Sequence, residues 1–80
     1  MNGSDLMNRF ETCMEAARKL PAYIQNRLAR RERRKKPTGP LDKTVVAATA
    51  IAAFVYDGEP IPKNCRNEIM PIVTAMRLSK

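Results

Sequence analysis

The stretch VVAATAIAAFVY, residues 45–56, is the longest apolar run in the chain and is interrupted only by Thr49. Alanine is its commonest residue, and alanine favours helices and is depleted in strands. A helix that is apolar on almost every side is typical of a buried element. We therefore predict a central helix over about residues 41–57. A strand over residues 51–56 is the alternative.

The segment before it predicts two further helices, separated by Pro21. Over residues 4–20, Ser4 suits the N-cap, and apolar residues recur every three or four positions, as on one face of a helix. A second helix is expected over residues 22–36, amphipathic only in its first half. The expected inward faces of the two helices consist of Leu6, Phe10, Cys13, Met14, Ala17 and Leu20, and of Tyr23, Ile24 and Leu28.

Proline and glycine mark the remaining boundaries. Residues 37–40 are expected to form a loop, in which Thr38 or Gly39 caps the central helix and Pro40 enters its first turn. Gly58 suits the left-handed position that ends this helix. The C-terminal helical segment, residues 63–79, is either a short turn followed by a helix from Pro71 or one helix kinked there. Together these elements predict an all-α single domain over residues 1–80, a bundle of four to five short helices.

The positive charge is concentrated in residues 27–36, with the sequence RLARRERRKK. This stretch holds seven of the fifteen Lys and Arg residues and one acid, a net +6, whereas the other seventy residues sum to +1. Such a local positive field attracts polyanions. Because like charges at helical spacing repel, we expect residues 31–36 to fray as a charged rod in solvent until a polyanion binds. The candidate binding residues are Arg27, Arg30, Arg31, Arg33, Arg34, Lys35 and Lys36.

Arginine outnumbers lysine five to two in this stretch. Arginine presents a planar fork that binds phosphate in two places and stacks on bases, so a helix rich in arginine favours nucleic acid. Residues 29–36, with the sequence ARRERRKK, resemble the arginine-rich motif of viral and phage RNA-binding peptides, and Arg-Arg-Glu-Arg-Arg is similar to the motif of lambdoid phage antiterminator N proteins. The resemblance implies a helix that enters a widened RNA groove and places its arginines on phosphates and base edges.

The residues that enzymes and metal sites use most are scarce. The chain has no histidine, and its two cysteines, Cys13 and Cys65, are 52 residues apart, outside any C-x-x-C pair. We therefore expect no catalytic site, no metal site and no cofactor. We expect both cysteines to be reduced and buried, with a disulfide between them as the alternative.

The composition also bears on partners and location. The longest apolar run is shorter than the roughly twenty residues that cross a membrane, and the N-terminal residues do not resemble a signal peptide. We expect a cytoplasmic protein, or a nuclear one in a eukaryotic host, with no membrane association. A homodimer is expected because a chain this short has difficulty covering an all-round apolar helix.

Three readings of the basic stretch remain. The favoured one is a small regulatory protein, of viral, phage or plasmid type, that binds an RNA or DNA duplex through its arginine-rich helix. The few aromatic residues make base stacking on single strands a minor contribution. The alternative is an interaction module or adaptor whose basic helix docks on an acidic protein. The third is a solvated basic helix or a nuclear-import tag.

Overall fold

The computed structural model describes residues 3–36 and 39–79, together with the side chains of residues 7–36 and 39–78. Within these ranges the chain forms four α-helices, one short 3-10 helix and no strand, so the predicted all-α class is confirmed and the strand alternative is wrong. The elements in chain order are α1 (Gly3–Lys19), α2 (Ala22–Lys35), α3 (Lys43–Tyr56), η1 (Lys63–Cys65) and α4 (Arg66–Ser79). None of these helices is both long enough and apolar enough to cross a membrane.

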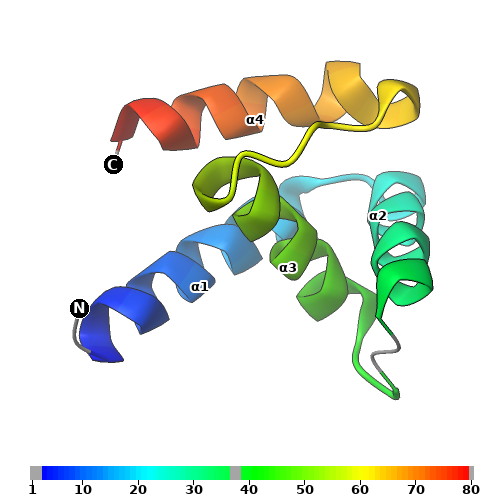
Figure 1. Cartoon of the computed structure of the whole chain (residues 1–80), viewed down its shortest axis with the longest axis horizontal. Coiled ribbons are helices and arrows are strands. Elements are labelled where there is room, and N and C mark those ends of the chain that lie inside the picture. Colours follow the sequence, from blue (N-terminus) through cyan, green and yellow to red (C-terminus); the bar gives the residue numbers. More distant parts are fainter. Residues whose placement is uncertain (1–2, 37–38, 80) are drawn as a thin grey trace.

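Helix α3 packs against α1, α2 and α4 (Figure 1). Its alanines let neighbouring helices approach closely, and its larger side chains fill the space between them. Phe54, Ile51 and Val46 are at most 1% exposed. The other three helices complete the core cluster with buried side chains: Cys13 and Ala17 from α1, Ile24 and Leu28 from α2, and Ile69 and Val73 from α4.

The start of α3 differs from the predicted boundary, whereas its end agrees with the prediction. The helix begins at Lys43, not residue 41, because Asp42 at the N-cap position is extended, with ψ 145°. The residues expected at the start of α3 therefore do not occupy those positions. Pro40 lies before the helix, and Gly39 is three residues from the N-cap, whereas Thr38 is outside the described residues. At the other end Gly58 has φ 70°, as predicted for the left-handed residue that ends a helix.

A buried glutamine joins α1 to α2. Gln25 is only 8% exposed, and its Nε2 donates a hydrogen bond of 2.6 Å to the Ala17 carbonyl at the end of α1. The last carbonyls of a helix lack partners within the helix, so this bond satisfies one of them and fixes the turn at Pro21. The Leu20 amide donates to the same oxygen at 3.1 Å.

The C-terminal segment is a single helix that continues through Pro71 after the short turn of η1. Proline cannot donate to the carbonyl four residues earlier, that of Asn67. Asn67 and Pro71 are both exposed, so water can bond this carbonyl. Farther along, Arg77 Nη2 donates a 2.6 Å hydrogen bond to the Phe54 carbonyl and so ties α4 to the last turn of α3.

The predicted inward face of α1 is only partly correct. Cys13, Ala17 and Leu20 are buried, but Phe10 is 48% exposed, and Met14 is only partly buried. Leu6 lies outside the residues whose side chains are described. A single chain buries Val46, Ile51 and Phe54, so the reason given for a homodimer, an uncovered central helix, no longer holds. The homodimer itself remains a prediction.

Candidate nucleic-acid interface

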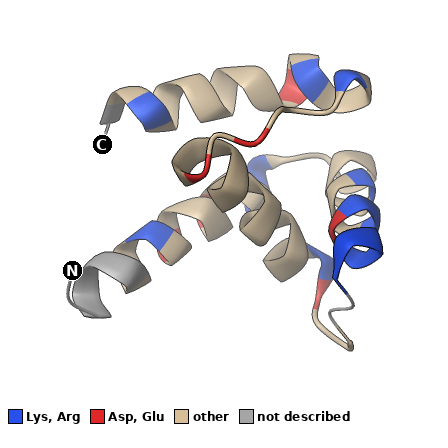
Figure 2. Cartoon of the chain, viewed as in Figure 1, with Lys and Arg blue, Asp and Glu red and all other residues tan. Residues whose placement is uncertain are grey.

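The basic helix α2 is anchored along its length, not only at its start. Ile24, Leu28 and Ala29 are buried, and the helix remains regular to Lys35. Residues 31–35, for which fraying is expected, are helical in the structure. The second half of α2 is not a rod in solvent, because several of its cations bind the rest of the molecule. Figure 2 shows the dense basic segment at the end of α2.

Two of the predicted binding residues make ion pairs with a loop that follows α3. Lys35 Nζ donates to Glu59 Oε1 at 2.7 Å, and Arg31 Nη1 lies 3.6 Å from the same oxygen. Glu32 adds two further contacts, a 3.4 Å hydrogen bond from Arg31 Nη1 and an ion pair at 3.8 Å from Lys35 Nζ. The Arg31 guanidinium also lies over the Phe54 ring, 5.5 Å from its centroid. Glu59 thus supplies the second acid that the sequence of α2 lacks.

Electrostatics at Glu59 reflect this arrangement. The hydrogen bond from Lys35 is the main cause that lowers the pKa of the Glu59 carboxyl, and Arg31 lowers it further, against a partial desolvation that raises it. A lowered pKa keeps the carboxylate charged as pH falls below its ordinary value of 4.5. The pair is exposed to solvent, so its contribution to stability is small and sensitive to salt.

Two other predicted residues donate to backbone carbonyls. Arg27 Nη1 bonds the Asn64 carbonyl in η1 at 2.7 Å, and Arg33 Nη2 bonds the Leu41 carbonyl before α3 at 3.0 Å. Each bond joins α2 to a segment distant in sequence. Lys36 ends the helix, with its backbone amide bonded to the Glu32 carbonyl and its side chain exposed.

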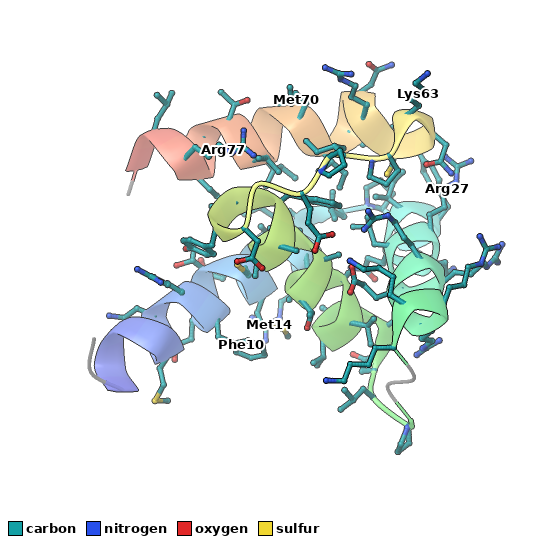
Figure 3. The ribbon with its side chains drawn as sticks, viewed as in Figure 1. Phe10, Met14, Arg27, Lys63, Met70 and Arg77 are labelled. Atoms are coloured by element: carbon teal, nitrogen blue, oxygen red, sulfur yellow. The ribbon has the colours of Figure 1, made fainter. Side chains whose placement is uncertain are left out.

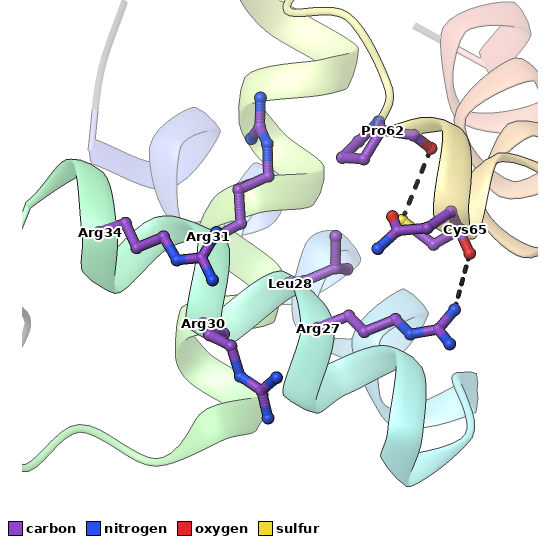
Figure 4. Close-up of a pocket in the computed structure, with 8 residues that line it drawn as sticks. Arg27, Leu28, Arg30, Arg31, Arg34, Pro62 and Cys65 are labelled. Carbon is purple, nitrogen blue, oxygen red and sulfur yellow. Dashed lines mark hydrogen bonds between the residues drawn. The ribbon is translucent and has the colours of Figure 1, made fainter.

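Arg30 and Arg34 differ from the other arginines of α2. Both are exposed, and among the described residues neither side chain has an ion pair or hydrogen bond. They lie one turn apart beside a hollow of about 390 Å³ between α2 and η1. Figure 4 shows Arg27 reaching toward η1, Arg31 toward α3, and Arg30 away from both. The hollow is lined by Arg27, Arg30, Arg31 and Arg34 around Leu28 from α2, and by Pro62, Asn64 and Cys65 on the other side.

Sequence reasoning missed the η1 side of this surface. Lys63 and Arg66 are exposed and flank Asn64 and Cys65. Figure 3 shows Lys63 at the same edge of the molecule as Arg27, in agreement with the bond from Arg27 to η1. No local signal in the sequence links residues 63–66 to α2. Only the packing of α4 on α3 brings these segments together.

The two cysteines are free and buried, as predicted, so the disulfide alternative is wrong. Burial raises the pKa of the Cys13 thiol, and burial followed by the charge of Glu68 raises the pKa of the Cys65 thiol against a smaller opposing effect of Arg27 and Arg31. Both groups are therefore neutral thiols at neutral pH. Within the described part of the chain, no group of three or more His, Cys, Asp or Glu side chains is placed to hold a metal ion.

Comparisons of the chain with protein-family models, with curated proteins and with solved structures found no match.

Proposed function

We propose that this protein is a small regulatory protein that binds an RNA or DNA duplex through α2. The observation that carries the proposal is the pair of exposed arginines, Arg30 and Arg34, on a helix whose other cations are already held in place. Arginines without an internal partner can bind phosphate without first breaking a protein contact. The all-helical scaffold, with α3 proposed as its central helix, packs against α2, which is helical from Ala22 to Lys35.

Within this proposal, the cations of α2 have two roles. Arg30 and Arg34 bind phosphate oxygens directly, joined by the exposed Lys36 at the end of the helix. Arg27, Arg31, Arg33 and Lys35 orient the helix through their protein contacts and add to the positive field. Phosphate contacts of this kind give affinity and position, whereas base-edge contacts give sequence preference. Either duplex offers the required row of phosphates.

The test of this function is binding of the purified, nuclease-treated protein to duplex RNA, duplex DNA and single strands. We expect both duplexes, or one of them, to bind more tightly than single strands of equal length, because the chain has few aromatic residues for base stacking. Affinity should fall steeply with salt as counterions are displaced. Absence of duplex binding at low salt would rule the proposal out. Binding of an acidic protein in its place would favour the alternative, a basic interaction module.

An exposed apolar surface on α1 supports self-association as a second part of the proposal. Met7 is 65% exposed, and it lines a hollow of about 580 Å³ together with Phe10 and Met14. Figure 3 shows Phe10 and Met14 together, away from α2. Methionine and phenylalanine suit an adaptable apolar interface. We propose that this surface, formed by Met7, Phe10 and Met14, binds a second copy of the chain.

Charge complementarity favours a second copy as the occupant. Glu11 and Glu15 line the same hollow, and so does Arg18. If two α1 helices pair in antiparallel fashion with their centre near Met14, each Arg18 lies close to Glu11 of the partner subunit. A two-fold axis makes this contact twice, since both subunits present the same surface. The basic surface on α2 is then doubled.

Sedimentation of the protein at micromolar concentration is expected to show a dimer, and Phe10→Lys is expected to convert it to a monomer. In the antiparallel arrangement position 10 lies opposite Arg18 of the partner subunit, so the new ammonium group meets a like charge among apolar side chains, which is unfavourable. Asn8→Lys is the control, because it makes the same charge change at an exposed residue outside the residues that line the hollow. A wild-type monomer, or equal effects of the two variants, would contradict this interface.

A further inference from the structure

We propose that the hollow between α2 and η1 is a phosphate-binding pocket that holds one phosphate group between Arg30, Arg34 and the side chain of Asn64. This inference deepens the proposed function, and in its nucleic-acid form it rests on that function. The ligand chemistry is a phosphate with free non-bridging oxygens. It can come from an internal phosphodiester of the duplex backbone or from a terminal phosphate monoester.

The size and lining of the hollow fit such a group. Its volume of about 390 Å³ is near the lower end of the roughly 300–1,000 Å³ that is usual for ligand pockets, so it suits a small group but not an extended chain. Four arginines line it, and none of the described residues that line it is acidic. Asn64 contributes the remaining polar side chain, whose amide N–H groups can donate to an anion.

The walls of the hollow increase the attraction for an anion. Leu28 and Cys65 are at most 1% exposed and form apolar parts of the lining. Charges beside such low-dielectric walls interact more strongly than charges surrounded by water. Burial raises the pKa of the Cys65 thiol, so no thiolate opposes the phosphate.

Part of the pocket is also ordered before it binds, while the Arg30 side chain, which points away from η1, turns toward it on binding. The 2.7 Å bond from Arg27 to the Asn64 carbonyl fixes η1 against α2. Arg31 is held by Glu59 and by the Phe54 ring, so its charge stays beside the hollow. Among the described residues Arg30 and Arg34 have no such partners, and they are one helical turn apart, a spacing from which two flexible side chains can reach the same phosphate. Fixed charges and available donors together reduce the cost of binding.

The first part of the test uses the wild-type protein. In an NMR titration with inorganic phosphate and then pyrophosphate, we expect the signals of Arg30, Arg34 and Asn64 to shift together and to saturate. Shifts spread evenly over all exposed Lys and Arg residues, without saturation, would overturn the proposal. This part does not depend on duplex binding. If the protein binds phosphate in the hollow but binds no duplex, the phosphate pocket is supported and the proposed function is rejected.

The second part uses a matched pair of variants. Asn64→Glu places a carboxylate in the pocket without altering α2, whereas Asn67→Glu makes the same charge change on an exposed position of α4 outside the residues that line the pocket. We expect Asn64→Glu to weaken duplex binding by about tenfold more than Asn67→Glu, the effect of losing one charge-assisted hydrogen bond. The log-log salt slope on duplex DNA should flatten by about 0.9, the contribution of one phosphate. Circular dichroism checks that both variants fold.

Equal effects of the two variants on a duplex that the wild type binds well would reject the pocket and leave the proposed function standing. Duplexes with a 5′-phosphate and with a 5′-hydroxyl distinguish the two sources of the ligand. Equal affinity for both, with the loss on Asn64→Glu retained, identifies an internal phosphodiester. Tighter binding of the 5′-phosphorylated duplex, abolished by Asn64→Glu, identifies a terminal phosphate.

Discussion

Replacing Phe54 by alanine is expected to lower the free energy of unfolding by about 3–5 kcal/mol, the usual cost of removing a buried aromatic side chain. Phe54 is fully buried and is the largest of the fully buried side chains among the described residues. Its removal leaves a cavity between α3 and the helices around it, and it also removes the ring over which Arg31 lies. Ile51→Ala should lower the free energy of unfolding by about 2–5 kcal/mol, because it also leaves a cavity.

Urea denaturation followed by circular dichroism measures this change. Thr49→Ala is the matched control, because Thr49 lies on the same helix but is exposed, and its hydroxyl bonds only the Val45 carbonyl of its own helix. Exposed substitutions of this kind usually change stability by less than about 0.5 kcal/mol. A loss below about 1 kcal/mol for both Phe54→Ala and Ile51→Ala would show that α3 does not carry the core. The total free energy of unfolding of a small domain is about 5–15 kcal/mol, so the expected loss is a large share of the stability.

Replacing both Arg30 and Arg34 by alanine is expected to flatten the salt dependence of duplex binding by about two units of log-log slope if each arginine holds its own phosphate, and by about one unit if the two share the phosphate of the α2–η1 pocket. If Arg30, Arg34 and Lys36 each hold a phosphate, the slope on duplex DNA is expected to be about −2.7 per subunit, and each lost contact removes about 0.9. Affinity should fall together with the slope. The fold should be unaffected, because both side chains are exposed and have no partner among the described residues.

The control for this variant removes the same charge from α1, by Arg9→Ala with Lys19→Ala. Both residues are exposed and lie outside the lining of the α2–η1 hollow. Among the described residues, the contact that this control removes is that of Arg9 with the Tyr56 ring. A double lysine variant at positions 30 and 34 separates charge from geometry. If paired contacts of the planar guanidinium matter, lysine should bind measurably more weakly than arginine. A double-alanine variant that binds with unchanged affinity and salt slope would exclude α2 as the site and favour the interaction-module alternative.

The periodicity of the sequence predicts the helices well, because local effects decide where helices form. The alanine-rich run around Ile51 indicates a buried helix, and Gly58 ends it in the left-handed conformation, as its lack of a side chain permits. The start of α3 is less predictable. Pro40 suits the first turn of a helix, yet the extended backbone at Asp42 delays the helix to Lys43. Helix starts depend on how the preceding loop packs, which the loop residues alone do not specify.

The apolar face of α1 shows a second property that the sequence pattern does not predict, the extent of burial along a helix. Phe10 and Met14 have the spacing of core residues, but α1 extends beyond the end of the core, and Phe10 is left exposed. Hydrophobic spacing identifies a face of a helix and not the length over which another element covers it. Gln25 shows the reverse case, a polar residue that can lie in the core because its side-chain amide donates to the Ala17 carbonyl at the end of α1.

The sequence by itself determined that the protein is helical, that residues 45–56 form a buried helix and that its positive charge is concentrated in residues 27–36. Those properties depend on residue type and near neighbours, which the order of residues contains. Only the tertiary structure decided which of these cations are engaged. Glu59 pairs with Arg31 and Lys35, and η1 bonds Arg27, across long sequence separations that arise from packing on α3. This packing leaves Arg30 and Arg34 without partners, because no acid or carbonyl from another described segment bonds their side chains.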